Sequence, residues 1–83
     1  MPTQLTVDLH PFFRNDRAID TAVRAAIFRA AREQVEVVEI ICGKGSGVLR
    51  KRVLAQLGQP HLRKLYRTVD AAGANEGRIL VRF

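Results

Sequence analysis

The fold of this chain is decided by the run Val35–Cys42, VEVVEIIC, and by the glycine-rich turn Gly43–Gly47, GKGSG, that follows it directly. β-branched and aliphatic residues dominate the run, which is typical of a strand covered on at least one face. Three glycines in five residues end this strand, because glycine permits the backbone conformations that a tight turn needs. We therefore expect a buried strand that finishes at a glycine-rich turn.

A second strand is predicted near the start of the chain, where apolar and polar residues alternate over residues 5–10, LTVDLH. Asp8 and His10 then share one face of it. Between the two strands, residues 17–33 carry apolar side chains at spacings of three and four, which predicts an amphipathic helix. A helix between parallel strands would bring Asp8, His10 and the glycine-rich turn to one edge of the sheet.

The second half of the chain predicts one more helix and two more strands. Residues 48–57 place apolar side chains along one side, and Gly58 and Pro60 end that helix. Residues 62–69 and 78–83 alternate well enough to be strands.

These elements predict one α/β domain over residues 1–83. It is a two-layer α+β sandwich with the order βαβαββ, in which two helices pack on one face of a four-stranded mixed sheet. We expect residues 1–4 to be flexible and the polar segment 70–77, DAAGANEG, to form a mobile hairpin loop.

The composition favours a polyanionic partner. Lysine and arginine number 14 against 8 acidic residues, for a formal charge of +6 and a pI of about 10.8. DNA or RNA is the partner expected, although generally basic solvated faces would give the same totals. The single Cys42 excludes an internal disulfide and a cysteine-based zinc site. A cytoplasmic location is expected, with no membrane partner, since no apolar segment is long enough to span a bilayer.

The glycine-rich turn is a candidate phosphate-binding site, formed by Gly43, Lys44, Gly45, Ser46 and Gly47. Backbone amides of such a turn can point at an anion, and the dipole of the following helix adds to the charge of the lysine. The spacing of a nucleotide-triphosphate P-loop and that of a dinucleotide fingerprint are both absent. A tight strand-to-helix turn with a solvent-facing lysine remains the alternative.

Asp8 and His10 are the candidate catalytic residues. A neutral imidazole can accept a proton from water or from a ribose 2′-hydroxyl, and a carboxylate can orient it or help to hold a divalent metal. Scission of RNA or DNA would use both roles. The alternative is an aspartate that caps the loop backbone beside an exposed histidine.

Cations around the turn could hold further phosphates. Arg50, Lys51 and Arg52 begin the second helix, and Arg14 lies in the loop after the first strand. Each neutralised phosphate would make binding weaker at higher salt. A solvated helix face would explain the same charges. Cys42 is expected to be a small apolar side chain, with a reactive thiol as the alternative.

The chain resembles the small MutS-related (Smr) domain family. The resemblance rests on VDLH in the first strand, the long amphipathic helix, the hydrophobic strand that runs into GKGSG, the basic second helix and a final hairpin that ends in GRILVRF. It covers nearly the whole chain. It implies a nucleic-acid endonuclease or nicking domain that acts on DNA, on mRNA or at ribosomes, with a fold similar to the carboxyl-terminal domain of bacterial translation initiation factor three.

The resemblance also implies roles for particular residues. Cleavage would depend on Asp8 and His10, and phosphate contact on Gly43–Gly47. Many family members carry a histidine directly before the glycine turn, where this chain has Cys42, so a mechanism that needs a second imidazole is in doubt. A non-catalytic module that binds nucleic acid or the ribosome is therefore the alternative function. No cofactor is assigned, participation of Mg²⁺ or Mn²⁺ stays open, and the sequence does not indicate the oligomeric state.

Overall fold

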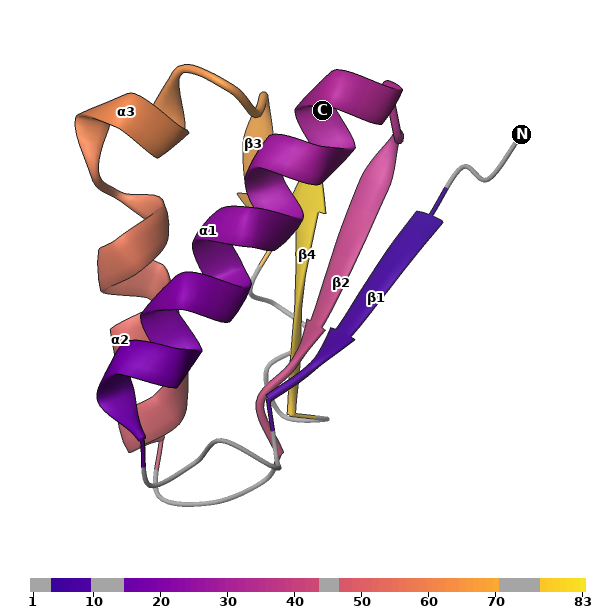
Figure 1. Cartoon of the computed structure of the whole chain (residues 1–83). Coiled ribbons are helices and arrows are strands. Elements are labelled where there is room, and N and C mark those ends of the chain that lie inside the picture. The colour runs from indigo at the N-terminus through magenta and orange to yellow at the C-terminus, as the bar shows by residue number, and fades with distance from the viewer. Residues whose placement is uncertain (1–3, 10–14, 44–46, 71–76) are drawn as a thin grey trace.

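The computed structural model describes residues 4–9, 15–43, 47–70 and 77–83. In these segments the chain forms β1 (Gln4–Asp8), α1 (Asp16–Glu33), β2 (Val37–Ile41), α2 (Val48–Leu57), α3 (Pro60–Arg63), β3 (Thr68–Asp70) and β4 (Arg78–Arg82). Figure 1 shows the helices on one side of the strands.

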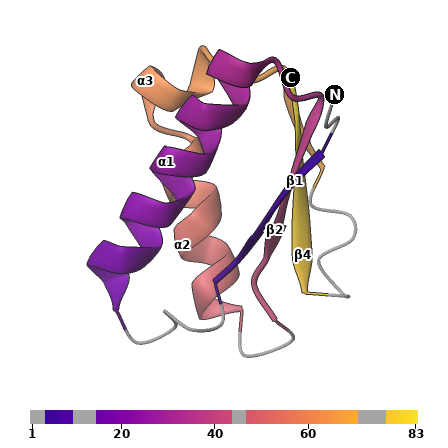
Figure 2. The ribbon, with the colours of Figure 1, turned by 45° about the vertical axis from the view of Figure 1, so that its right-hand side comes forward.

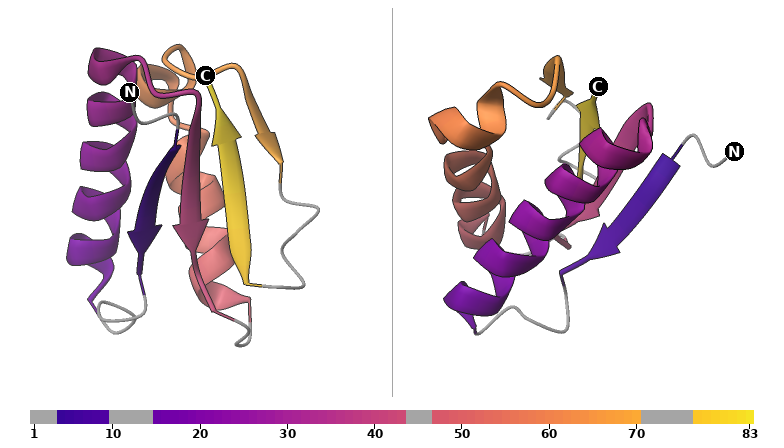
Figure 3. Two further views of the ribbon diagram at one scale, coloured as in Figure 1. Left: turned by 90° about the vertical axis from the view of Figure 1, so that its right-hand side faces the viewer. Right: turned by 45° about the horizontal axis from the view of Figure 1, so that its top comes forward.

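The four strands form one mixed sheet in the order β1-β2-β4-β3. β1 and β2 are parallel, whereas β4 runs antiparallel to both β2 and β3. The left view of Figure 3 shows this order face-on. The mixed four-stranded sheet and the α+β class predicted from the sequence are confirmed.

The core lies between the sheet and the helices, as Figure 2 shows from near the sheet edge. Val38 and Ile40 of β2 are fully buried, and so are Ile79 and Val81 of β4. They form one cluster with the apolar stripe of α1, to which Ile27 belongs. Removal of these aliphatic side chains from water holds the two layers together.

α1 begins where its sequence predicts. The side-chain oxygen of Asn15 accepts a hydrogen bond of 3.0 Å from the Ala18 amide, which satisfies one of the free donors of the first turn. The spacings of three and four noted above bring one stripe of its side chains into the core, namely Ile19, Val23, Ala26, Ile27 and Ala30. The helix ends at Gln34, whose φ of 58° is left-handed.

The strand predicted over residues 62–69 is wrong for residues 62–67. Pro60 begins the short helix α3, and only Thr68–Asp70 belong to β3. Proline at the first helical position has the φ that a helix requires and lacks only an amide that would have no helical partner. The amides of Leu62 and Arg63 both donate to the Gln59 carbonyl, at 3.0 and 2.9 Å, so this segment follows a helical turn, and Leu62 is fully buried.

The two segments expected to be flexible or mobile, residues 1–4 and 70–77, lie partly outside the described residues. Gln4, expected in the flexible start, is the first residue of β1. Of the segment expected to be a mobile hairpin loop, Asp70 ends β3 and Gly77 is buried, and residues 71–76 are not among those described.

Among the described segments, no helix packs on the other face of the sheet, here called the helix-free face (Figure 3). Asp8, Ile41 and Arg78 form one row across it, because Asp8 pairs with Ile41 and Ile41 pairs with Arg78. In the next row, Glu39 accepts a hydrogen bond of 2.9 Å from Arg78. None of the described helices is long and apolar enough to cross a membrane.

Candidate nucleic-acid interface

The ends of β1 and β2 meet at one edge of the sheet. The Leu9 amide donates to the Ile41 carbonyl at 3.0 Å, directly after the parallel pairing of Asp8 with Ile41. β1 and β2 are connected through α1, which packs against both of them. The sequence-based expectation that these two strand ends converge is therefore confirmed for the backbone.

A third strand completes this edge. The amides of Cys42 and Gly43 both donate to the Gly77 carbonyl, at 2.6 and 2.9 Å, so the beginning of the glycine-rich turn is tied to the start of β4. We call this edge, made of Asp8–Leu9, Ile41–Gly43, Gly47 and Gly77, the carboxyl rim. It lies at the bottom of Figure 1.

Gly77 approaches Gly43 too closely for any other residue. A Cβ atom at position 77 would lie 2.6 Å from the Gly43 carbonyl carbon, and the φ of Gly77 is +77°. Sequence reasoning missed this contact. The signal that could have found it is a glycine placed directly before a strand, where a close approach of two backbones is common.

α2 starts at the carboxyl rim. Gly47 precedes it with a left-handed φ of 87°, and this glycine N-cap makes no side-chain capping hydrogen bond. The first-turn amides of α2 therefore have no helical partner, and the positive end of its dipole faces the rim. These are the features that favour an anion at a helix start.

Some of the candidate site residues lie in the described segments of the chain, and others do not. Asp8 is exposed on the helix-free face, whereas α2 and its cations belong to the helix layer. A ligand that contacts both would have to lie across the end of the sheet. His10, Arg14, Lys44, Gly45 and Ser46 lie outside the described residues.

The three cations of early α2 have different environments. Arg50 and Lys51 are exposed, and the positive charge of Arg50 acts on the Cys42 thiol at the end of β2. Arg52 instead contacts α1: its Nη2 lies 2.8 Å from Asp20 Oδ2 and its Nη1 lies 3.5 Å from Asp16 Oδ2. The sequence alone did not show that Arg52 has a different role from Arg50 and Lys51, because the partners of Arg52 are more than thirty positions away.

Cys42 has the character of an apolar side chain. It is 7% exposed, and burial raises the pKa of its thiol above the ordinary value, while the charge of Arg50 partly opposes this shift. A thiol in this environment is protonated at neutral pH and is a poor nucleophile. The reactive-thiol alternative has no support in this geometry.

The described residues offer little to a metal ion. No group of three or more histidine, cysteine, aspartate or glutamate side chains gathers within them. At the described part of the carboxyl rim, Asp8 supplies an exposed carboxylate that suits a hard divalent cation.

The fold and the rim define a class of protein, namely a small α+β domain whose parallel strands end beside a glycine-rich strand-to-helix turn. The family model of the Smr domain matches residues 7–83, essentially the whole chain. The chain therefore belongs to the Smr domain family, whose members generally bind nucleic acid. Neither the comparison with curated proteins nor that with solved structures gave a match.

Proposed function

We propose that this Smr domain binds a strand of RNA or DNA at the carboxyl rim and cleaves or nicks it there. The parallel pairing of β1 with β2 supports the proposal, because it brings Asp8 and Leu9 beside Ile41, and in the sequence His10 follows Leu9 while the glycine-rich turn begins two residues after Ile41. The uncapped start of α2 and the exposed Arg50 and Lys51 give the same end of the domain a positive field.

In this proposal His10 is the general base, and Asp8 orients it or helps to hold a metal. On RNA, His10 would take the proton of a 2′-hydroxyl. The 2′-oxygen then forms a bond to phosphorus as the bond to the 5′-oxygen breaks. The 5′-oxygen takes a proton from water, which leaves a cyclic phosphate and a 5′-hydroxyl. Lys44 and the backbone amides of residues 44–47 would stabilise the charge on the phosphate oxygens. The Gly43 amide is not part of this set, because it already donates to the Gly77 carbonyl. Arg50, Lys51 and Arg14 would hold neighbouring phosphates.

A second function is a module that binds nucleic acid or the ribosome without cleavage. The environment of Cys42 favours it, since a buried, protonated thiol occupies the position where many relatives carry an imidazole. Cleavage by this chain would then depend on His10 as the sole imidazole at the rim. A cytoplasmic location is part of both proposals.

A cleavage assay with a matched histidine control separates the two functions. Labelled single- and double-stranded RNA and DNA are incubated with the wild type, His10→Ala, Asp8→Asn and His61→Ala, each with and without EDTA. His61 is the other histidine of the chain and is exposed on α3. We expect His10→Ala to slow cleavage by about 100-fold or more, the loss typical of a general base, and His61→Ala to cleave at the wild-type rate.

Equal product formation by the wild type and His10→Ala would contradict the catalytic proposal. Binding without product in all four proteins would support the non-catalytic module. Identification of a cyclic phosphate at the product end would establish attack by the sugar hydroxyl, and loss of product in EDTA would establish a metal requirement.

A further inference from the structure

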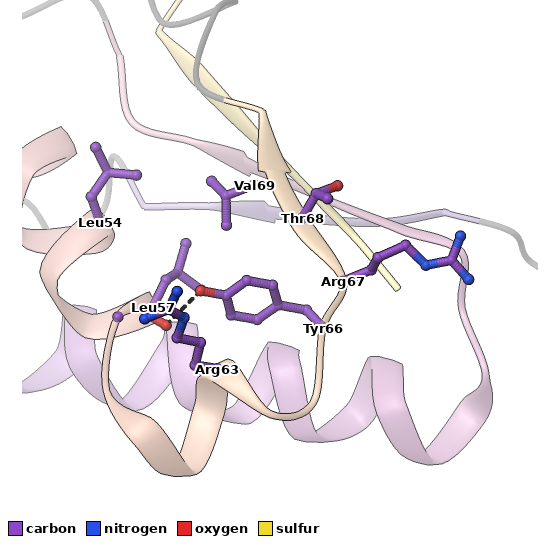
Figure 4. A pocket seen from close by; sticks show the side chains of 8 residues that line it. Leu54, Leu57, Arg63, Tyr66, Arg67, Thr68 and Val69 are labelled. Atoms are coloured by element: carbon purple, nitrogen blue, oxygen red, sulfur yellow. Dashed lines mark hydrogen bonds between the residues drawn. The ribbon is translucent and has the colours of Figure 1, made fainter.

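A groove opens between α2, α3 and β3, at the end of α2 that is farther from the carboxyl rim. It has a volume of about 350 Å³ and is lined by Leu54, Leu57, Gly58, Arg63, Tyr66, Arg67, Thr68 and Val69. Figure 4 shows leucines of α2 facing Val69 and Tyr66 across it, with Arg67 extending outward at its margin. The groove has an apolar floor and a cationic margin.

The ring of Tyr66 is held in the groove wall. Its hydroxyl donates a hydrogen bond of 2.8 Å to the Leu57 carbonyl at the end of α2, and the residue is half-buried. Part of an aromatic ring therefore borders an open groove, and an aromatic surface beside cations is what base stacking and phosphate contact require.

The charge at this groove is entirely positive. Arg63 and Arg67 are exposed, Lys64 is exposed between them in the sequence, and none of the eight lining residues is acidic. Within the described segments, no ion pair involves any of these three cations. They are therefore available to a ligand of negative charge.

α2 connects the groove to the carboxyl rim. Arg50 lies one turn before Leu54, and Leu54 lies one turn before Gly58, so all three share one stripe of the helix. Arg50 also acts on Cys42 at the end of β2, which places it at the rim end of that stripe. In Figure 1, α2 runs from the rim toward α3. Its ten residues span about 15 Å.

We propose that the groove is a second contact for the same polynucleotide strand that binds at the carboxyl rim. The strand leaves the rim, passes Arg50 and enters the groove, where Arg63 and Arg67 contact its phosphates and a base lies against Tyr66. This inference rests on the proposed function. At the rise of about 3.4 Å per nucleotide of a strand stacked as in duplex DNA, a length of about 15 Å corresponds to about four nucleotide steps. Short stacked oligonucleotides would therefore reach one of the two contacts and longer ones both.

Tyr66 provides a direct probe, because it is the single tyrosine of the chain and the sequence has no tryptophan. The experiment measures tyrosine fluorescence and affinity for single-stranded oligonucleotides of 3 and 12 nucleotides, over a range of salt concentrations. The proteins are the wild type, the groove variant R63Q/R67Q, the rim variant K44A/R50A and the control variant R24Q/R32Q. The control removes two exposed arginines of α1, outside both contacts.

We expect the 12-mer to quench Tyr66 in the wild type. R63Q/R67Q should bind the 12-mer about tenfold more weakly, with a salt slope smaller by about 1.4, which is two phosphate contacts on a single strand. Its affinity for the 3-mer should change less than that of K44A/R50A, and R24Q/R32Q should match the wild type.

Three results would overturn this inference. In the first, the wild type binds the 12-mer while R63Q/R67Q binds it with unchanged affinity and slope, which leaves the rim proposal intact. In the second, a deca-glutamate peptide displaces the 12-mer as well as unlabelled 12-mer does, which assigns the groove to an acidic protein segment. In the third, the wild type binds no polynucleotide, which removes the proposed function as well.

Discussion

Gly77 links the end of β2 to the start of β4 through one carbonyl and one close contact. Its oxygen accepts hydrogen bonds from both Cys42 and Gly43, and its α-carbon lies where a side chain would meet the Gly43 backbone. The position of the glycine-rich turn relative to β4 therefore depends on this residue. A side chain here would meet the Gly43 backbone, so a substitution at position 77 would act on the candidate site through the first residue of the glycine-rich turn.

We expect Gly77→Ala to lower the free energy of unfolding by about 2 kcal/mol or more, because a left-handed φ alone costs a non-glycine residue about 1–3 kcal/mol and the new Cβ atom also meets backbone. Urea unfolding followed by circular dichroism measures this. Gly58→Ala is the matched control. Gly58 has a right-handed φ of −76°, and a Cβ atom there would make ordinary contacts of 3.5 Å, so alanine should raise stability by about 0.5 kcal/mol. Equal stability of the two variants would contradict this account of Gly77.

At the scale of elements, α1 and α2 are joined near their starts by Arg52. Its guanidinium makes two hydrogen bonds to Asp20, of 2.8 and 3.2 Å, and lies near Asp16 in the first turn of α1. Arg50, two residues earlier, makes no ion pair with any described residue and is exposed toward the rim. Arg52 therefore joins the two helices, whereas Arg50 is available for the ligand binding proposed above.

Arg52→Gln should lower the free energy of unfolding by about 0.5 kcal/mol, in the range of partly exposed ion pairs. The difference from the wild type should shrink at high salt, because salt screens exposed charges. Arg50→Gln should change stability less than Arg52→Gln does, because substitutions at exposed sites usually stay within about 0.5 kcal/mol, and it should weaken nucleic-acid binding. Thermal unfolding and a binding titration on both variants test this. The assignment is wrong if Arg52→Gln loses as much affinity as Arg50→Gln while keeping full stability.

At the scale of the whole molecule, stability is expected to be highest in the middle of the sheet. β2 is paired on both sides, by β1 and β4, and its Val38 and Ile40 are fully buried. β3 is a three-residue strand at the sheet edge. Amide hydrogen exchange should therefore be slowest in β2 and the facing residues of β4, and fastest among the strands in β3. Uniform protection across all four strands would contradict this order.

Much of the fold could be predicted from local patterns. The apolar spacing of α1, the mostly aliphatic run of β2 and the alternation of β1 each extend over enough residues to indicate the type of element. The helical crossover between β1 and β2 then favours a parallel pair. The segment 60–69 is too short to distinguish the two periods. Its first half forms a helical turn because Pro60 starts one and Leu62 reaches the core.

The candidate site, like the fold, could be predicted only in part from the sequence. The chain order β1-α1-β2 was sufficient to predict that the strand carrying Asp8 ends beside the glycine-rich turn, because the connection between two parallel strands leaves few alternatives. Tertiary structure alone decided that Gly77 closes this edge, that Arg52 belongs to α1 while Arg50 stays free of described ion pairs, and that Arg63, Tyr66 and Arg67 border a groove. These features arise from contacts between residues distant in sequence, and a periodic pattern carries information only about the few residues within its own turn or strand.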